Sequence, residues 1–158
     1  MTQSDRQVVR LRRDLDDTLE TPQWPDGFAM RIFRPSDAEV HHALLTLTFD
    51  DGDDGPFETW WPKLSGNAEY DPELIFLVFD RDEGLAGLAQ CFSNAFLRDL
   101  AVHPDMRGRG IGEALLRHVF LAFRDRGAAH VDLKTDADNF GAIRLYERVG
   151  MRQVPLEG

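Results

Sequence analysis

The sequence predicts an α/β (α+β) fold in which six to seven strands are flanked by about four helices. Short apolar runs of strand length recur along the chain, and the segments between several of them repeat apolar residues every three or four positions. Gly, Pro and Asp mark the boundaries of these segments. With 158 residues, of which 42% are hydrophobic, the chain is long enough for one domain with its own core.

Two regions are predicted, an N-terminal strand and linker at 1–27 and a single domain at 28–158. An apolar run at 8–11 lies among charged residues and is typical of a short strand near solvent. The segment 18–27 contains two prolines and a glycine, which predicts a linker or an extended arm.

The first half of the domain predicts two strands joined by a tight turn, preceded by one strand and two helices. Ser36 and Asp37 are suited to cap the first helix, and Asp80 and Gly84 supply the hairpin turn. The expected elements are a strand at 28–33, a helix at 36–49, a helix at 58–64, and strands at 74–79 and 85–92.

The second half predicts a strand, a long amphipathic helix, a strand, a second helix and a last strand. The long helix carries five apolar residues on one face, namely Leu115, Leu116, Val119, Phe120 and Phe123. Gly150 stops the second helix. The expected elements are a strand at 96–102, a helix at 110–126, a strand at 130–133, a helix at 139–149 and a strand at 151–154.

A glycine turn joins the strand at 96–102 to the long helix and predicts an anion site. Glycines allow close approach of a ligand, and the first N–H groups of a helix are unpaired and lie at its positive end. Arg107 and Arg109 lie within this turn of Gly108, Gly110 and Gly112. The spacing fits neither a Gly-x-x-x-x-Gly-Lys loop nor the dinucleotide fingerprint. The alternative is that the glycines only make a tight turn.

The histidines, the acidic run and the cysteine of the sequence do not fit the spacing of a metal site. His41 and His42 lack a partner at ligand spacing and are interpreted as surface or packing residues. The acidic run 50–55 does not fit a calcium loop and is interpreted as a solvated loop. Cys91, the one cysteine, is expected to be a packed strand residue.

Composition limits the possible partners and compartments. A net charge of −10 argues against nucleic-acid binding, and no apolar run is long enough to span a membrane. The N-terminus lacks the apolar core of a secretory signal, and a single cysteine indicates a reducing, cytoplasmic location. An acidic surface favours a cationic acceptor such as an amine.

Two segments resemble the signature motifs of the GNAT superfamily of acyl-CoA-dependent N-acyltransferases. Residues 107–112 fit Arg/Gln-x-x-Gly-x-Gly/Ala, and residues 139–151 fit Asn-x-x-Ala-x-x-Leu-Tyr-x-x-x-Gly-Phe except for Met151. The resemblance implies a GNAT fold with a mixed, twisted sheet and acetyl-CoA as co-substrate, without a metal. Residues 15–35 and 70–74 also resemble the C-terminal half of tandem GNAT proteins such as mycothiol synthase.

The resemblance assigns roles to residues of both segments and of the preceding strand. Tyr146 takes the position of the general acid, and the Leu100 N–H is the expected donor to the thioester carbonyl. The resemblance does not supply the bases: from the sequence, Asp99 and Glu58 are candidate bases, directly or through water, and the alternative for Asp99 is a salt-bridged strand carboxylate. His103 is interpreted as structural. The expected cofactor-binding residues are Leu100, Ala101, Val102, Arg107, Gly108, Arg109, Gly110, Ile111, Gly112, Asn139 and Phe140.

One departure from the family concerns the last strand. GNAT domains usually end with a seventh strand inserted beside the fifth, and this sequence stops at Gly158. We expect residues 7–13 to supply that strand, in the same molecule or in a partner, so the chain is a monomer or a homodimer.

The implied activity is transfer of an acetyl group from acetyl-CoA to a primary amine of a small molecule. Two alternatives stay open, a protein N-terminal or lysine acetyltransferase and a non-catalytic acyl-CoA sensor. A sensor would keep the glycine turn but would not depend on Tyr146.

Overall fold

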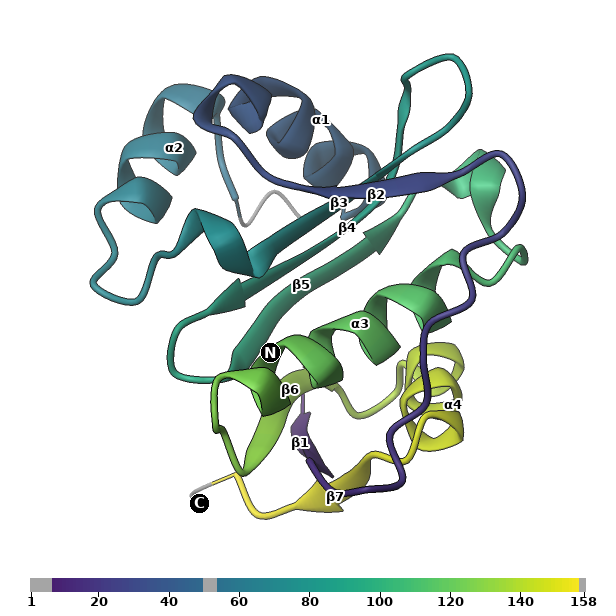
Figure 1. Ribbon diagram of the computed structural model, residues 1–158. Helices are drawn as coiled ribbons and strands as arrows, with labels where there is room; N and C mark the ends of the chain where they lie inside the picture. Colours follow the sequence, from purple (N-terminus) through teal and green to yellow (C-terminus); the bar gives the residue numbers. More distant parts are fainter. Residues whose placement is uncertain (1–6, 50–53, 157–158) are drawn as a thin grey trace.

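The computed structural model describes residues 7–49 and 54–156. In these ranges the chain forms a seven-stranded sheet and four α-helices (Figure 1). The strands are β1 (Val8–Asp14), β2 (Ala29–Ile32), β3 (Ile75–Phe79), β4 (Leu85–Phe92), β5 (Phe96–Val102), β6 (His130–Asp136) and β7 (Arg152–Val154). The helices are α1 (Ala38–Thr48), α2 (Phe57–Ser65), α3 (Ile111–Asp125) and α4 (Phe140–Arg148).

The sheet is mixed, with the strand order β2-β3-β4-β5-β6-β1-β7. All neighbours are antiparallel except β5 and β6, which run parallel. The N-terminal strand β1 is inserted between β6 and β7, with Leu11 opposite both Leu133 and Gln153. The fifth of the strands predicted from the sequence, at 130–133, is β6. The prediction that residues 7–13 add a strand beside it is confirmed, and they do so in the same molecule.

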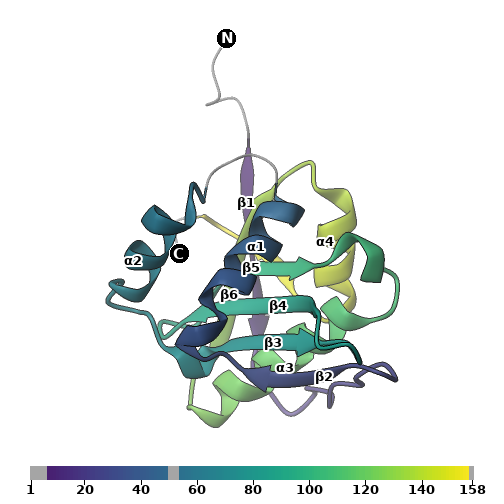
Figure 2. The same cartoon turned by 90° about the horizontal axis from the view of Figure 1, so that it is seen from above.

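Helices cover both faces of the sheet, and each face has its own apolar cluster (Figures 1 and 2). Side chains alternate along β3, so Phe76 and Val78 pack with α3 and α4 while Ile75 and Leu77 pack with α1 and α2. The apolar cluster on the side of the sheet that α3 and α4 cover is called the α3 cluster below. The five predicted apolar residues of the long helix are all buried in it. The predicted helical periodicity therefore identifies the face of α3 that packs against the sheet.

The expected elements are present with boundaries close to the predicted ones. The clearest difference is β6, which the sequence predicts at 130–133 and which continues to Asp136. Residues 134–136 are polar and carry no strand pattern, but they pair with β1 as far as Val8. The extra length therefore depends on a partner strand more than 100 residues away in sequence.

Three other interpretations can be compared with the structure. Cys91 is buried, and burial raises the pKa of its thiol, as expected for a packed strand residue. His41 is buried in the core and His42 packs against Phe57 and Trp60, so both are packing residues. Most of the acidic run 50–55 lies outside the described residues. Within the described ranges, no helix is long and apolar enough to cross a membrane.

Candidate active site

The parallel strands β5 and β6 diverge and open the centre of the sheet. They pair only at Phe96 opposite Asp132 and Leu97 opposite Leu133, although β5 continues to Val102. On its other side β5 stays paired with β4, and there Gln90 faces Asp99 whereas Cys91 faces Leu97. Arg98 is therefore an extra residue, a β-bulge of the kind that often lies beside active sites. This bulge lies two residues before Leu100.

Backbone groups of β5 face the opening. The Val102 carbonyl accepts a hydrogen bond from Arg107 Nε at 3.2 Å, and the His103 N–H donates to Ala86 of β4 at 2.8 Å. Because backbone groups alternate in direction along a strand, Leu100 directs its N–H and C=O to the same side as Val102. The N–H predicted to polarise a carbonyl therefore points away from β4 and into the opening.

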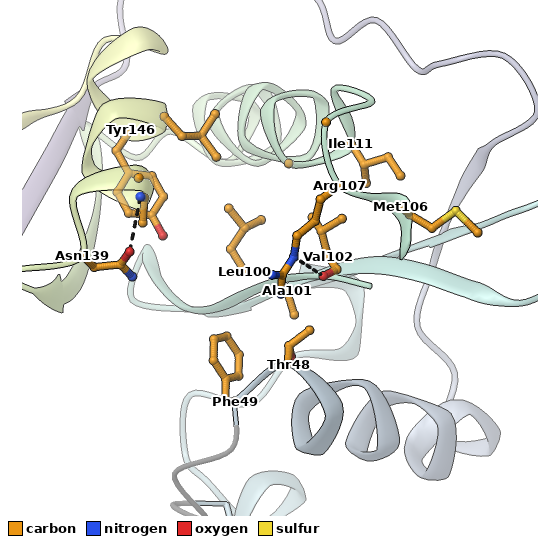
Figure 3. A pocket seen from close by; sticks show the side chains of 15 residues that line it. Thr48, Phe49, Leu100, Ala101, Val102, Met106, Arg107, Ile111, Asn139 and Tyr146 are labelled. Carbon is orange, nitrogen blue, oxygen red and sulfur yellow. Dashed lines mark hydrogen bonds between the residues drawn. The ribbon is translucent and has the colours of Figure 1, made fainter. Parts of the chain in front are cut away.

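A pocket of about 560 Å³ occupies this opening (Figure 3). It brings together most of the predicted cofactor residues from β5, the glycine turn and α4. The lining residues are Thr48, Phe49, Leu100, Ala101, Val102, Met106, Arg107, Gly108, Ile111, Gly112, Asn139, Gly141, Ala142, Leu145 and Tyr146. Its volume is in the range of small-molecule and cofactor sites.

The glycine turn forms one end of the pocket, at the N-terminus of α3. Gly108 and Gly110 have φ angles of +78° and +90°, a region that glycine adopts readily and other residues avoid. The turn thereby brings backbone N–H groups to the positive end of a 15-residue helix. Such an arrangement is suited to a phosphate or pyrophosphate. Arg109 and Gly110 do not line this pocket.

Tyr146 lies at the other end, with its hydroxyl directed into the pocket (Figure 3). It is 9% exposed, and its ring packs in the α3 cluster. Burial and, to a smaller extent, the charge of Asp99 raise the pKa of Tyr146 to about 12. The phenol is therefore protonated at neutral pH and can donate a proton or a hydrogen bond.

The other predicted residue of α4 that lines the pocket is Asn139. It caps the helix, and its Oδ1 accepts a hydrogen bond from the Ala142 N–H at 3.4 Å (Figure 3). Phe140 is 65% exposed and does not line the pocket, because it is the first residue of α4 and faces solvent.

The two candidate bases differ in their position relative to the pocket. Asp99 follows the bulge, and Arg98 Nη1 donates a hydrogen bond to its carboxylate. Arg98 also pairs with Asp54 at 3.2 Å, and these carboxylates keep its pKa above the ordinary value although burial opposes them. Glu58 is on α2 and does not line the pocket. Of the two, Asp99 is nearer to the expected reaction centre, since it directly precedes Leu100.

Several lining residues were not predicted as site residues from the sequence. Thr48 and Phe49 belong to the C-terminal end of α1, and they line the pocket because that end reaches the opening beside β5 (Figure 3). Leu145 and Ala142 lie on α4 within the second motif, and only their neighbour Tyr146 has a chemically reactive group. In residues 7–49 and 54–156, no group of three or more His, Cys, Asp or Glu side chains could hold a metal ion.

Comparison with known proteins agrees with this geometry. The sequence model of the acetyltransferase (GNAT) family matches residues 37–151. The chain belongs to this family.

Relatives and solved structures extend the likeness over most of the chain. A mycothiol acetyltransferase of Clavibacter sepedonicus is 31% identical over 169 residues, covering 96% of this chain and 53% of the relative. A streptothricin acetyltransferase of Streptomyces lavendulae is 32% identical over 130 residues, covering 79% of this chain and 63% of the relative. The structure of a GCN5-related N-acetyltransferase from Sphaerobacter thermophilus superposes with a TM-score of 0.81 at 31% identity, covering 93% of this chain and 48% of the other. The chain thus spans about half the length of the mycothiol acetyltransferase that it matches.

Proposed function

We propose that this protein transfers an acetyl group from acetyl-CoA to a primary amine of a small molecule. The observation that carries the proposal is that one pocket joins the glycine turn, the outward-facing backbone of β5 and the Tyr146 hydroxyl. Two of the relatives are named for mycothiol and streptothricin, which supports a small-molecule acceptor.

The co-substrate fits the pocket in a defined direction. The pyrophosphate is held by backbone N–H groups of the turn between Gly108 and Gly112, two residues that line the pocket where the helix end favours negative charge. The pantetheine arm runs along β5 and pairs with the backbone groups of Leu100 and Val102. The thioester then lies between Leu100 and Tyr146, at the end of the pocket away from the turn.

The reaction is a direct attack of the neutral amine nitrogen on the thioester carbonyl carbon. A C–N bond forms, the C–S bond breaks, and the Leu100 N–H stabilises the negative charge that develops on the carbonyl oxygen. Tyr146 donates its proton to the leaving thiolate. The amine gives up a proton to Asp99, directly or through water. The two proton transfers balance when the buffer restores the Tyr146 and Asp99 protonation states.

The first test is CoA release from acetyl-CoA in a pool of amines, with the wild type and Tyr146→Phe. We expect turnover with at least one amine and a decrease of about a hundredfold in kcat for the variant, with unchanged binding of acetyl-CoA. Tyr70→Phe is the matched control, because Tyr70, the only other tyrosine, packs edge-on against Trp61 and does not line the pocket.

Two outcomes would contradict the proposal. Tight binding of acetyl-CoA without turnover of any amine in the pool would favour the sensor or a protein substrate. Absence of acetyl-CoA binding would show that the glycine turn does not form the expected anion site.

A further inference from the structure

A buried polar pair lies in the otherwise apolar layer between α1, α2 and the sheet. Gln90 of β4 is 1% exposed and His41 of α1 is 0% exposed. Gln90 and His41 lie beside each other and interact, but the Gln90 amide and the two His41 ring nitrogens form no hydrogen bond of normal geometry with a described residue. Burial lowers the pKa of His41 to about 3, against a smaller opposing effect of Gln90, so the ring is neutral. Because unpaired buried polar groups cost free energy, this pair indicates a polar occupant nearby.

A small cavity of about 60 Å³ adjoins Gln90 between α2 and β4. Its walls are Trp60, Lys63, Leu64, Asn67, Gln90, Phe92 and Arg98. Five of these side chains carry hydrogen-bond donors, and two of the five are cations. The space suits a group of a few heavy atoms.

The cavity lies beside the bulge of β5, because Arg98 is one of its walls. Gln90 and Asp99 are direct cross-strand partners, so their side chains lie on the same face of the sheet. Arg98 lines the cavity and also hydrogen-bonds Asp99, the residue before Leu100. A ligand that spans from the thioester to this cavity would therefore pass Asp99.

The charges favour an anionic group. Arg98 is shared between the carboxylates of Asp54 and Asp99, whereas Lys63 has no ion-pair partner among the described residues. An added carboxylate would accept hydrogen bonds from Lys63 and from the Gln90 amide, which has no other partner there. Charge-assisted hydrogen bonds of this kind are stronger than neutral ones.

We propose that this cavity binds a carboxylate of the acceptor, so that the preferred substrate is an amine that also carries a carboxylate several bonds away. The proposal rests on the proposed function, which supplies the amine and the acetyl donor. It makes Lys63 and Gln90 specificity residues that contact the acceptor at a distance from the bond that forms.

The test compares acceptors that differ only in the group at the end opposite the amine. We would measure kcat/KM for amino acids with two to six carbons between the amine and the carboxylate, and for the corresponding primary amides and amino alcohols. We expect at least one carboxylate to exceed its neutral counterparts by about tenfold. Equal or better turnover of the neutral compounds throughout the series would overturn the proposal.

Substitutions at the cavity test whether the preference for a carboxylate arises there. Lys63→Met and Gln90→Met should remove the tenfold preference and leave the KM for acetyl-CoA unchanged. Lys134→Met, the same substitution at the other lysine, should preserve the preference, because Lys134 is exposed on β6 and lines none of the cavities described above. Loss of the preference in all three variants alike would contradict a site at this cavity. Circular dichroism checks that Gln90→Met is folded, and Lys63→Met tests the site independently of the core.

A binding experiment separates this proposal from the proposed function. N-acetylated forms of the same amino acids and of their amides are titrated into the protein with CoA present, and heat or ligand NMR signals are measured. Tighter binding of the carboxylates in the wild type but not in Lys63→Met would support the cavity even if no amine were acetylated. Turnover of neutral amines with no such difference in binding would support the enzyme and reject the carboxylate site.

Discussion

At the scale of single residues, Tyr146 shows how burial keeps a phenol protonated beside a pocket. Its side chain is almost fully enclosed by the α3 cluster, yet the hydroxyl faces the pocket (Figure 3). Desolvation destabilises the phenolate, and the nearby Asp99 charge adds to this effect, so the pKa of Tyr146 rises to about 12. In the proposed reaction this proton passes to the leaving thiolate, whose basicity is raised by the same loss of solvent that raises the pKa of the phenol.

This raised pKa gives a prediction for the pH dependence. Because the folded-state pKa lies above the ordinary value, the active protonated form persists from neutral pH up to about 12 and is lost only above it. We expect kcat/KM to rise with pH as the acceptor amine loses its proton, and to stay on a plateau up to about pH 10.

The measurement is a pH–rate profile from 6 to 10.5, corrected for uncatalysed hydrolysis of the thioester. Circular dichroism over the same range is the control for folding. A decline in kcat/KM below pH 9.5 that the Tyr146→Phe variant lacks would contradict the predicted pKa.

At the scale of elements, β1 is fixed in the sheet by a buried carboxylate. Asp132 of β6 has 3% of its side chain exposed, and it accepts hydrogen bonds from Arg10 Nε at 2.7 Å and from Arg12 Nε at 2.8 Å. Burial tends to raise the pKa of Asp132, but the two guanidinium groups outweigh it and hold the pKa below the ordinary value. Arg10 and Arg12 lie on one face of β1, and their hydrogen bonds to Asp132 tie this face to the same face of β6.

Asp132→Asn should therefore destabilise the protein by about 3 kcal/mol, because it leaves two arginines facing an uncharged group at a buried site. The free energy of unfolding is measured in urea at pH 7. Asp14→Asn is the control on β1, where the exposed pair with Arg152 is expected to contribute little.

The sign of the pH effect follows from the same ion pair. A depressed pKa stabilises the fold above the unfolded-state value near 4, and this stabilisation is lost as the pH falls through the folded-state pKa. The wild type should lose stability on acidification in this range more steeply than Asp132→Asn. Parallel pH profiles of the two proteins would show that Asp132 does not contribute in this way.

At the scale of the whole molecule, the position of a strand in the sheet is independent of its position in the chain. β1 comes first in sequence, but it lies between β6 and the last strand, β7 (Figure 1). The residues after β1 return along α3, where Leu15, Leu19 and Trp24 pack against the core. In register, Arg10 near the start of β1 lies opposite Val154 at the end of β7, so a short turn could join the two as a hairpin.

A circular permutant tests this independence. The chain is opened in the turn at 26–27, and residues 7–26 are attached after Gly158 by a short glycine-serine linker. Because every strand keeps its neighbours, we expect cooperative thermal unfolding and acetyl-CoA binding close to those of the parent. A matched variant with the appended segment scrambled should lose the cooperative transition. An unfolded permutant would show that the original connection is essential.

Local interactions made much of the fold predictable from sequence. The apolar spacing of α3 depends on helical geometry alone, and all five predicted residues are buried in one cluster. The glycine turn and the placement of Tyr146 one helix later were also predictable, because they lie in two short motifs. Phe140 shows the limit of such motifs, since its position at the first turn of α4 directs it to solvent and leaves it 65% exposed.

The sequence by itself determined the order and type of the elements, the glycine turn before α3 and the family. Each of these depends on residues that are close together in the chain. Only the tertiary structure decided that β1 completes its own sheet, that Arg98 bulges beside Leu100, and that the end of α1 lines the pocket. These features depend on pairing and packing between segments far apart in sequence, where geometry selects the partner and local propensity carries no information.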